Sequence, residues 1–257
     1  MVIDFSRYSP VQIGPVVKVA EVTRENFNGE FLVGGATNTL ISPTPPRLGI
    51  LGEEYRQIEW EGKFLKVGGG VRNRHLYNFA KRHNLGGFEF LRQLPGTIGG
   101  SLKMNAGVKG EVISSQLVAV ELLEGWIPVE ELQFWYRGSS IEGPIFRALF
   151  QISRGYSREL DQKLVELRRN QPKGPSLGSV FKNPPGGFAG KLIGEAGLKG
   201  RRIGGILISP IHGNFFINAG NGTYSDYLRA VELARREVFR QFGVELELEI
   251  KILDKNF

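Results

Sequence analysis

The sequence predicts an α+β protein that contains more than one packed part. A chain of 257 residues is longer than one small core needs and suits two or three lobes. Short apolar runs interrupted by glycine and proline, typical of strands and turns, occupy the chain up to about residue 153. Longer stretches with helical spacing follow. This change from strand-like to helical patterns predicts a domain boundary near residue 153.

The composition is that of a folded protein without a membrane span. Hydrophobic residues make up 41% of the chain and charged residues 23%, and no apolar run approaches the ~20 residues of a membrane helix. No basic start precedes an apolar segment with a cleavage site, so we expect a cytoplasmic protein. Cysteine is absent, and His75, His83 and His212 are too scattered to indicate a metal site. We therefore expect no metal.

The elements up to residue 153 can be assigned in order. The first fifty residues, with VQIGPVVKVAEV and FLVGGATNTLIS ending in PTPPRLG, predict a small α/β lobe. QIEW and KFLKVGG predict paired strands, and RNRHLYNFAKRHNL predicts a helix with Leu76, Phe79 and Ala80 on one face. Further strands are expected in SSQLVAVELLEG, WIPV and IFRALFQI.

Helices dominate the prediction beyond Ser153. RELDQKLVELRRN places Leu160, Leu164 and Leu167 on one helical face, and AGKLIGEAGLKG predicts a second helix. RRIGGILIS and NFFIN predict strands. The last helix has the clearest signals, which are a capping pair Thr223 and Asp226, a stop at Gly243 and an apolar stripe. That stripe consists of Tyr227, Val231, Ala234, Val238 and Phe242.

The tail VELELEIKIL, residues 244–253, alternates strictly between apolar and charged residues. This period of two predicts a half-buried strand whose glutamates lie on the solvent side.

Two glycine-rich loops suggest a bound ligand. PGTIGGSLKMNAG at 95–107 and FLVGGATNTLIS at 31–42 expose backbone that another molecule could approach closely. The formal net charge of +7 favours an anionic partner, which could be nucleic acid, a membrane surface or a phosphorylated small molecule. We expect no membrane partner. The basic clusters RRN and KGRR are not interleaved with aromatic residues, so nucleic acid is not expected.

Several segments together resemble one flavoprotein family. P-loop, G-x-G-x-x-G and metalloprotease signatures are absent from the sequence. Residues 34–38, VGGGVRN at 67–73 and the loop at 95–107 instead resemble the flavin-contacting segments of the vanillyl-alcohol-oxidase type of fold. YRGS, GSVFKNP, AGKLIGEAGLKG, SPIHGNFFIN and ELEIKIL then follow in the order expected for one family. The sequence is similar to the UDP-N-acetylenolpyruvoylglucosamine reductases, and its length fits their shorter, type II subfamily.

The resemblance implies a fold, cofactors and a reaction. It implies a FAD-binding fold of the vanillyl-alcohol-oxidase type over 1–153, with lobes at about 1–50 and 51–153. A smaller α+β substrate-binding domain would cover 154–243, and a strand over 244–257 would return to the active site. FAD and NADPH would reduce UDP-N-acetylglucosamine enolpyruvate to UDP-N-acetylmuramate for peptidoglycan synthesis. We expect a monomer that acts on this small molecule.

The resemblance also implies roles for single residues. Arg137 in YRGS would polarise the substrate carboxylate, Ser179 in GSVFKNP would donate a proton, and Glu249 would be the catalytic glutamate. Glu247 is the alternative to Glu249, because side chains two positions apart on a strand share a face. Lys182 and Asn183 would contact the substrate. FAD would contact Gly34, Gly35, Ala36, Thr37, Asn38, Thr39, Pro95, Gly96, Thr97, Gly99, Gly100, Asn105, Ala106 and Gly107.

Two other functions stay open at this point. A different flavin-dependent oxidoreductase of the same fold would act on an alcohol or a sugar, and would not need the segments GSVFKNP and ELEIKIL. A basic protein that binds a nucleotide without catalysis would be colourless when purified. A flavin absorption spectrum separates that possibility from the enzymes.

Overall fold

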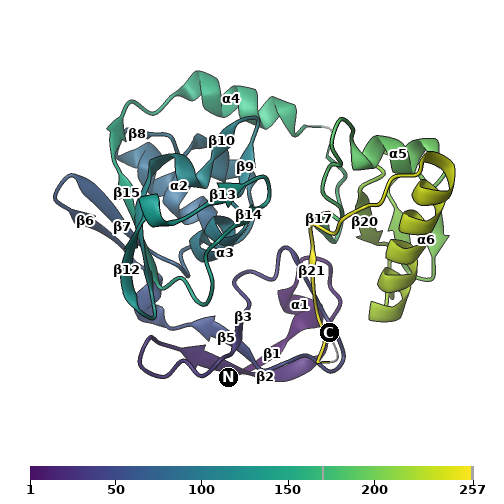
Figure 1. The fold of residues 1–257 in the computed structure, drawn as a ribbon, viewed down its shortest axis with the longest axis horizontal. Helices are drawn as coiled ribbons and strands as arrows, with labels where there is room; N and C mark the ends of the chain where they lie inside the picture. The colour runs from purple at the N-terminus through teal and green to yellow at the C-terminus, as the bar shows by residue number, and fades with distance from the viewer. Residues whose placement is uncertain (170, 256–257) are drawn as a thin grey trace. The chain divides into compact units, whose positions relative to one another are not determined.

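The chain forms two compact units in a computed structural model, which describes residues 1–169 and 171–255. The central unit contains Val19–Gly35 and Arg47–Arg169. The terminal unit contains Met1–Lys18, Ala36–Pro46 and the described residues that follow Arg169. Figure 1 colours the chain by residue number, so the terminal unit combines purple segments with green and yellow ones.

The central unit is built on an antiparallel sheet in the order β12-β11-β15-β7-β6. A parallel group of β2, β3 and β5 belongs to the same unit, although β2 begins in the terminal one. The strands are β2 (Val16–Val22), β3 (Phe31–Leu32), β5 (Leu48–Leu51), β6 (Ile58–Glu61), β7 (Phe64–Gly68), β8 (Leu85–Gly86), β9 (Gly107–Val108), β10 (Glu111–Val112), β11 (Leu117–Leu122), β12 (Gly125–Pro128), β13 (Phe134–Trp135), β14 (Gly138–Ser139), β15 (Arg147–Gln151) and β16 (Ser153–Arg154).

Three α-helices accompany these strands in the described part of the central unit: α2 (Asn73–Arg82), α3 (Ile98–Lys103) and α4 (Arg158–Leu167). Short 3-10 turns lie at η1 (Glu53–Tyr55), η2 (Glu89–Gln93), η3 (Ile113–Gln116) and η4 (Val129–Glu131). The helix expected around Leu76 and Ala80 is confirmed as α2, and both side chains are fully buried in the core beside Val67, Val120 and Phe150 of the sheet. Burying one helical stripe against one sheet face is what the 3.6-residue period predicts.

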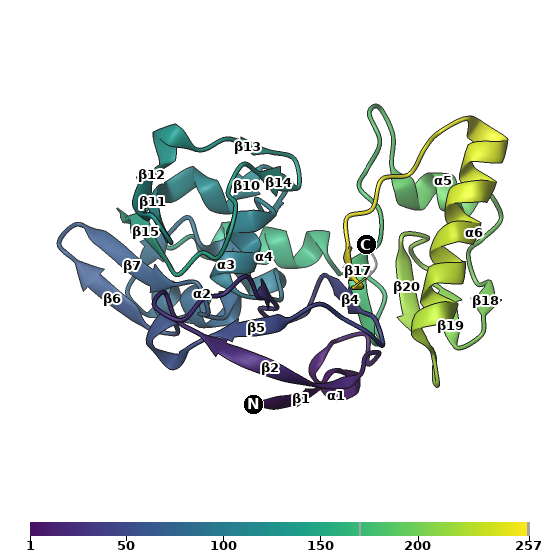
Figure 2. The same cartoon turned by 60° about the horizontal axis from the view of Figure 1, so that its bottom comes forward.

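The terminal unit contains a second antiparallel sheet, in the order β17-β20-β19-β18, with α5 and α6 packed into the same core (Figure 2). A short N-terminal hairpin, α1 and a parallel pair of β4 and β21 complete it. The elements are β1 (Val2–Asp4), α1 (Phe5–Tyr8), β4 (Thr39–Ile41), β17 (Ser176–Ser179), α5 (Ala189–Glu195), β18 (Arg202–Ile203), β19 (Ile206–Ile208), β20 (Phe215–Asn218), α6 (Tyr224–Phe242) and β21 (Lys251–Leu253).

Helix α6 confirms its sequence signals at both ends. Thr223 and Asp226 form a reciprocal capping box, and Gly243 ends the helix with a left-handed φ of 67°. The first four residues of the expected stripe are buried, but Phe242 remains 39% exposed. Phe242 is the last residue of the helix, directly before Gly243, and this part of the predicted stripe is wrong.

The tail differs from the predicted strand. The predicted alternation holds as far as Ile250, with Leu246 and Ile250 buried, but Leu253 is then buried instead of Ile252. Only β21 is a strand, and it pairs in parallel with β4. An isolated bridge between Phe181 and Leu248 supports the preceding segment. A period of two indicates which side chains share a face of a strand, but it does not identify the partner strand. The partner decides how many residues pair. Positions 256–257 of the predicted strand lie outside the described residues.

The compact units divide at other places than the boundaries expected near residues 50 and 153. Residues 1–18 and 36–46 belong with the terminal unit, because β4 pairs with β21 and Asn218 binds the backbone of Val11 and Gln12. Helix α4 stays with the central unit, because Leu164 lies in its core and Asp161 binds Tyr77. Which unit has which function stays a prediction. The mixed helix and strand content is α+β.

Candidate functional site

The two glycine-rich loops expected to share a ligand meet within the central unit. A side-chain carbon added to Gly34 would clash with Oγ1 of Thr97, so the loops approach each other as closely as bare backbone allows. Thr97 is buried and caps α3, while Gly34 and Gly100 are exposed on either side of it. Gly34 and Gly100 are therefore positions where another molecule could approach the main chain closely.

A third glycine-rich segment, Gly68–Val71, supports this surface from within the protein. The Gly99 N–H donates to the Gly69 carbonyl at 2.8 Å, and the Ile98 N–H donates to the Val71 carbonyl at 2.9 Å. Side-chain carbons at Gly68 or Gly69 would clash with the carbonyls of Tyr55 and Ile145. Part of the bare backbone is thus required by close packing of the protein on itself rather than by a ligand.

Asn73 is a fully buried amide that sequence reasoning missed. Its Nδ2 donates to Oγ of Ser101 at 2.8 Å and to the Leu94 carbonyl at 3.2 Å, and its N–H donates to the Gly96 carbonyl at 3.1 Å. These bonds fix both ends of the 95–101 segment. The signal that could have identified it is the amide directly after VGGGVR, because a buried amide must find partners in neighbouring loops.

Arg137 lies at the tip of the β13–β14 hairpin, where its φ of 58° places a non-glycine residue in the left-handed region. Its guanidinium stands 5.0 Å from the ring centre of Tyr136. Two bonds tie the hairpin to the 95–107 loop: Oγ of Ser139 donates to the Lys103 carbonyl at 3.0 Å, and Nδ2 of Asn105 donates to the Trp135 carbonyl at 3.3 Å. Arg137 is therefore held beside the predicted flavin loop.

Left-handed backbone recurs in the predicted site segments. Ala36 has φ 48° and Asn105 has φ 42°, in addition to Arg137. Such conformations cost about 1 to 3 kcal/mol each and persist where surrounding structure enforces them, which is common at functional sites. The strain supports these segments as site candidates.

In the terminal unit, the continuation of the first loop binds the tail. Nδ2 of Asn38 donates to the Glu249 carbonyl at 2.9 Å, and the Lys251 N–H donates to the Asn38 carbonyl at 2.8 Å. A predicted flavin residue and the predicted catalytic glutamate are therefore neighbours, although they are separated by 211 positions.

Ser179 and Glu249 are brought together through the backbone of Val180. The Glu249 N–H donates to the Val180 carbonyl at 2.8 Å, so Glu249 lies opposite the residue that follows Ser179. β17 shifts register between Ser176 and Ser179 as it pairs with β20, and Gly178 has φ 78° at that irregularity. An irregularity of this kind re-aims the next side chain, and it explains why glycine precedes the serine.

Lys182, Asn183 and Glu247 make contacts within the protein. The Lys182 ammonium pairs with the Glu247 carboxylate, which is 72% exposed, and its N–H donates to the Glu247 carbonyl at 2.8 Å. Oδ1 of Asn183 accepts from the Ala189 N–H at 3.1 Å, at the start of α5. Glu247 is thus committed to Lys182, whereas Glu249 lies against the Ser179 strand.

The SPIHGNFFIN segment supplies the other side of that strand. The Val180 N–H donates to the Asn214 carbonyl, and Nδ1 of His212 accepts from the Asn214 N–H at 3.2 Å. The bond to Nδ1 leaves the proton of the neutral ring on Nε2. Burial, aided by the charge of Lys199, lowers the pKa of His212 below its ordinary value of 6.5. His75 is exposed on α2, and His83 is exposed directly after it.

The depressed pKa of His212 predicts a pH dependence of stability. As pH falls below about 6.5, the unfolded chain takes up a proton that the folded ring still refuses, so the free energy of unfolding should fall. The His212→Asn variant keeps an acceptor for the Asn214 N–H but has no titrating ring. Urea unfolding at about pH 7.5 and 5.5 should show a smaller acid-side loss in the variant than in the parent. Equal losses in both proteins would contradict the assignment.

Comparisons with known proteins place the chain in a family. A family model described as "UDP-N-acetylenolpyruvoylglucosamine reductase, C-terminal domain" matches residues 170–253. A UDP-N-acetylenolpyruvoylglucosamine reductase from Campylobacter jejuni is 44% identical over 259 residues, which cover 98% of this chain and 100% of the relative. The chain belongs to the UDP-N-acetylenolpyruvoylglucosamine reductase family. It is accordingly an oxidoreductase, as the sequence resemblance indicated.

Other members of the UDP-N-acetylenolpyruvoylglucosamine reductase family agree. A relative from Helicobacter pylori is 37% identical, with 98% of both proteins covered. The crystal structure of the Thermus caldophilus reductase matches with a TM-score of 0.87 and 31% identity, over 98% of each chain. Within the described residues, no helix is long and apolar enough to span a membrane, and no group of acidic, histidine or cysteine side chains could hold a metal ion.

Proposed function

We propose that the chain reduces UDP-N-acetylglucosamine enolpyruvate to UDP-N-acetylmuramate, with FAD and NADPH, in peptidoglycan precursor synthesis. The observation that carries this proposal is 44% identity to a named reductase over essentially both full lengths. An alcohol- or sugar-oxidising flavoenzyme would share the fold without that full-length identity. We also propose the vanillyl-alcohol-oxidase type of fold for the flavin-binding part.

The residues of the two glycine-rich loops fit a flavin. Gly34 and Gly100 are exposed and have no side chain, and a side-chain carbon at Gly34 would clash with Thr97. Close approach to such bare main chain suits both a pyrophosphate and a flat ring. Gly34–Thr39 and Pro95–Gly107 would hold the cofactor. The bound flavin would supply the hydride chemistry, with NADPH as the source of reducing equivalents.

Arg137 would bind the carboxylate of the enolpyruvyl group. A guanidinium is permanently charged and planar, so it can stabilise negative charge that develops on that carboxylate during the reaction. The β13–β14 hairpin and the bond from Asn105 to the Trp135 carbonyl limit how far the backbone of Arg137 can move. Such preorganisation is what makes a cation effective in catalysis.

Ser179 would donate the proton to C2 of the substrate, and Glu249 would orient the groups around it. The backbone link from the Glu249 N–H to the Val180 carbonyl supports Glu249 over Glu247, because it places Glu249 opposite the residue that follows Ser179. Lys182 would contact the substrate near its diphosphate, and Asn183 would shape the start of α5 beside it.

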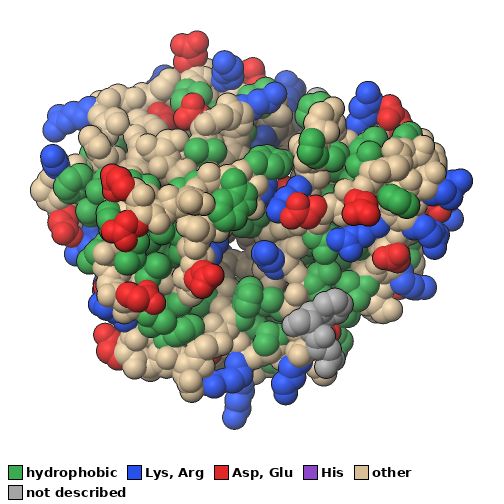
Figure 3. Space-filling view, viewed as in Figure 1, with side chains coloured by type: hydrophobic (Ala, Val, Ile, Leu, Met, Phe, Trp, Pro, Cys, Tyr) green, Lys and Arg blue, Asp and Glu red, His purple; other side chains and the backbone are tan. Residues whose placement is uncertain are grey.

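A small anionic substrate also suits the distribution of charge. Basic and acidic side chains are interspersed over the face shown in Figure 3, which differs from the continuous basic surface typical of nucleic-acid binding. We propose a cytoplasmic monomer that acts on a small molecule.

The reductase proposal predicts a yellow protein with a releasable cofactor. Acid precipitation should leave FAD in solution, because covalent flavin attachment in this type of fold uses a histidine or a cysteine. The chain has no cysteine, and neither His75 nor His83 lies in the two loops. Anaerobic addition of NADPH should bleach the flavin absorbance, and UDP-N-acetylglucosamine enolpyruvate should restore it. Bleaching without restoration by this substrate would reject the proposed reaction, and a colourless protein that cannot be loaded with FAD would reject the flavoenzyme.

A further inference from the structure

Asn214 binds the backbone of the two residues that follow Ser179 through several hydrogen bonds. Its side chain is 2% exposed. Oδ1 accepts from the Phe181 N–H at 2.9 Å, and Nδ2 donates to the carbonyl of the same residue at 2.7 Å. Its own carbonyl accepts from the Val180 N–H at 2.9 Å. Three hydrogen bonds to one residue therefore fix three consecutive peptide units, from Ser179–Val180 to Phe181–Lys182.

The middle one of these peptide units, Val180–Phe181, also binds the backbone of Glu249. The Val180 carbonyl accepts from the Glu249 N–H at 2.8 Å, and Phe181 bridges to Leu248. Val180 and Phe181 thus form a short rail with Asn214 on one edge and the tail on the other. A displacement of this rail would move Ser179 and Glu249 together.

We propose that Asn214 is a positioning residue for the reaction, acting on Ser179 and Glu249 through the backbone of Val180 and Phe181. This inference rests on the proposed function, because it assumes the roles given to those two residues. An error of about 1 Å in the position of a catalytic group can cost about 10²-fold in rate. The bulge before Ser179 interrupts the regular pairing of β17 with β20, so the side chain of Asn214 replaces the ladder bonds that fix a normal strand.

Asparagine is the side chain that this role requires. Only an amide of this length offers one acceptor and one donor side by side, matching the N–H and C=O of a single residue. An aspartate in its place would set a carboxylate oxygen against the Phe181 carbonyl. An alanine would leave the Phe181 N–H and C=O buried without these partners, which costs about 1 to 3 kcal/mol per group.

Asn218 provides a matched control at the end of β20, the strand that Asn214 directly precedes. Its side chain is 9% exposed and makes four hydrogen bonds, donating to Val11 and Gln12 and accepting from Gly220 and Gly222. It therefore resembles Asn214 in burial and bonding, but its partners are loops that do not carry Ser179 or Glu249. Both alanine variants should lose comparable stability.

The test compares Asn214→Ala with Asn218→Ala in FAD-loaded enzyme, at a temperature where circular dichroism shows both folded. In Asn214→Ala we expect substrate-driven flavin reoxidation to slow by about 10- to 100-fold, with NADPH-driven reduction changed by less than about threefold. In Asn218→Ala both steps should stay within about threefold of the parent. Amide hydrogen exchange, measured without substrate, should accelerate at Phe181 and Glu249 in Asn214→Ala only.

The outcomes separate the inference from the proposed function. Reoxidation at the parent rate in Asn214→Ala, or an equal loss in both half-reactions, would overturn the positioning role. Unchanged exchange at Phe181 and Glu249 would also overturn it, because the rail would then hold without Asn214. If the parent itself shows no reoxidation by this substrate, the reductase proposal fails, and with it the role of Asn214, whatever the exchange data show.

Discussion

Replacing Ser179 with alanine is expected to slow reduction of the enolpyruvyl substrate by roughly 10² to 10⁴, the usual contribution of a general acid. FAD binding and NADPH-driven reduction should remain nearly intact, since neither step needs a proton at C2. Stopped-flow absorbance of the flavin separates the two half-reactions. The expected trace shows normal bleaching by NADPH followed by slow return of colour.

The position of Ser179 explains why this effect should be specific. The register shift between Ser176 and Ser179 re-aims a side chain that a regular strand would turn elsewhere, and the neighbouring Val180 is bound to Glu249. A serine hydroxyl is a weak acid in water, so placement must supply most of its effect.

Ser176→Ala is the matched control for Ser179, because Ser176 is another half-buried serine of β17 that lies before the irregularity. It should leave both half-reactions within about threefold of the parent, as expected of a residue outside the chemistry. Ser179→Cys should keep more activity than Ser179→Ala, since a thiol can still donate a proton. Return of colour at the parent rate in Ser179→Ala would assign Ser179 to the turn instead.

Local signals in the sequence were sufficient for much of the fold. Thr223, Asp226 and Gly243 set the two ends of α6 because capping is decided by residues within one turn of the helix end. Leu76 and Ala80 located α2 for a similar reason, since one apolar face is enough to define a helix.

Long-range pairing was not predictable from the sequence. The tail shows the right alternation, yet its ladder is short because β21 finds β4 in parallel, a partner more than 200 positions away. Residues 36–46 join the terminal unit through the same pairing, which no local signal in the sequence indicates.

Site residues that belong to a local sequence motif could be predicted. Site contacts between distant segments could not. Gly178 before Ser179 is a local signal, and the left-handed backbone and the bulge there agree with it. The bond from Asn38 to the Glu249 carbonyl and the clamp made by Asn214 join distant segments, so no spacing rule points to them. Whether the named site residues act as proposed stays a prediction.

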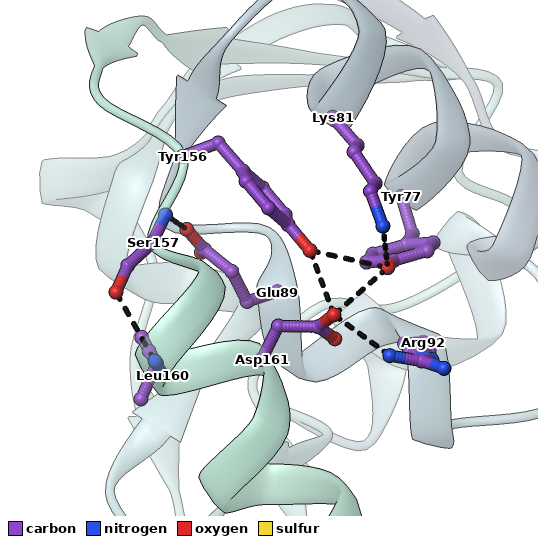
Figure 4. Close-up of polar contacts among 8 residues, drawn as sticks. All are labelled: Tyr77, Lys81, Glu89, Arg92, Tyr156, Ser157, Leu160 and Asp161. Carbon is purple, nitrogen blue, oxygen red and sulfur yellow. Dashed lines mark hydrogen bonds and ion pairs between the residues drawn. The ribbon is translucent and has the colours of Figure 1, made fainter.

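Helix α4 carries a buried carboxylate, Asp161. Asp161 is 3% exposed, and its Oδ2 accepts from Tyr156, Tyr77 and Arg92 at 2.7, 3.1 and 2.7 Å (Figure 4). Burial and the bonds to Tyr77 and Asp161 raise the pKa of Tyr156, so its hydroxyl stays protonated and can donate. The network joins α4 to α2 and η2, which keeps the helix in the central unit.

Asp161→Ala is expected to destabilise the protein by about 2 to 4 kcal/mol. The substitution removes the shared acceptor of two tyrosine hydroxyls, and a buried polar group without a partner costs about 1 to 3 kcal/mol. Arg92 is partly exposed, so water can solvate its guanidinium when Asp161 is removed. The loss of stability should therefore be smaller than that for breaking a fully buried ion pair, which is about 3 to 5 kcal/mol. Urea unfolding followed by tyrosine and tryptophan fluorescence would measure the change.

Two further variants identify the network as the cause. Tyr156→Phe removes one donor and leaves Tyr77 and Arg92 on Asp161, so it should cost only about 1 kcal/mol. The double variant should lose less stability than the sum of the losses in the two single variants. The reason is that Tyr156→Phe removes a hydroxyl that Asp161→Ala would otherwise leave without its acceptor. Strict additivity, or an Asp161→Ala loss below about 0.5 kcal/mol, would mean that α4 is held by Leu164 and the apolar core alone.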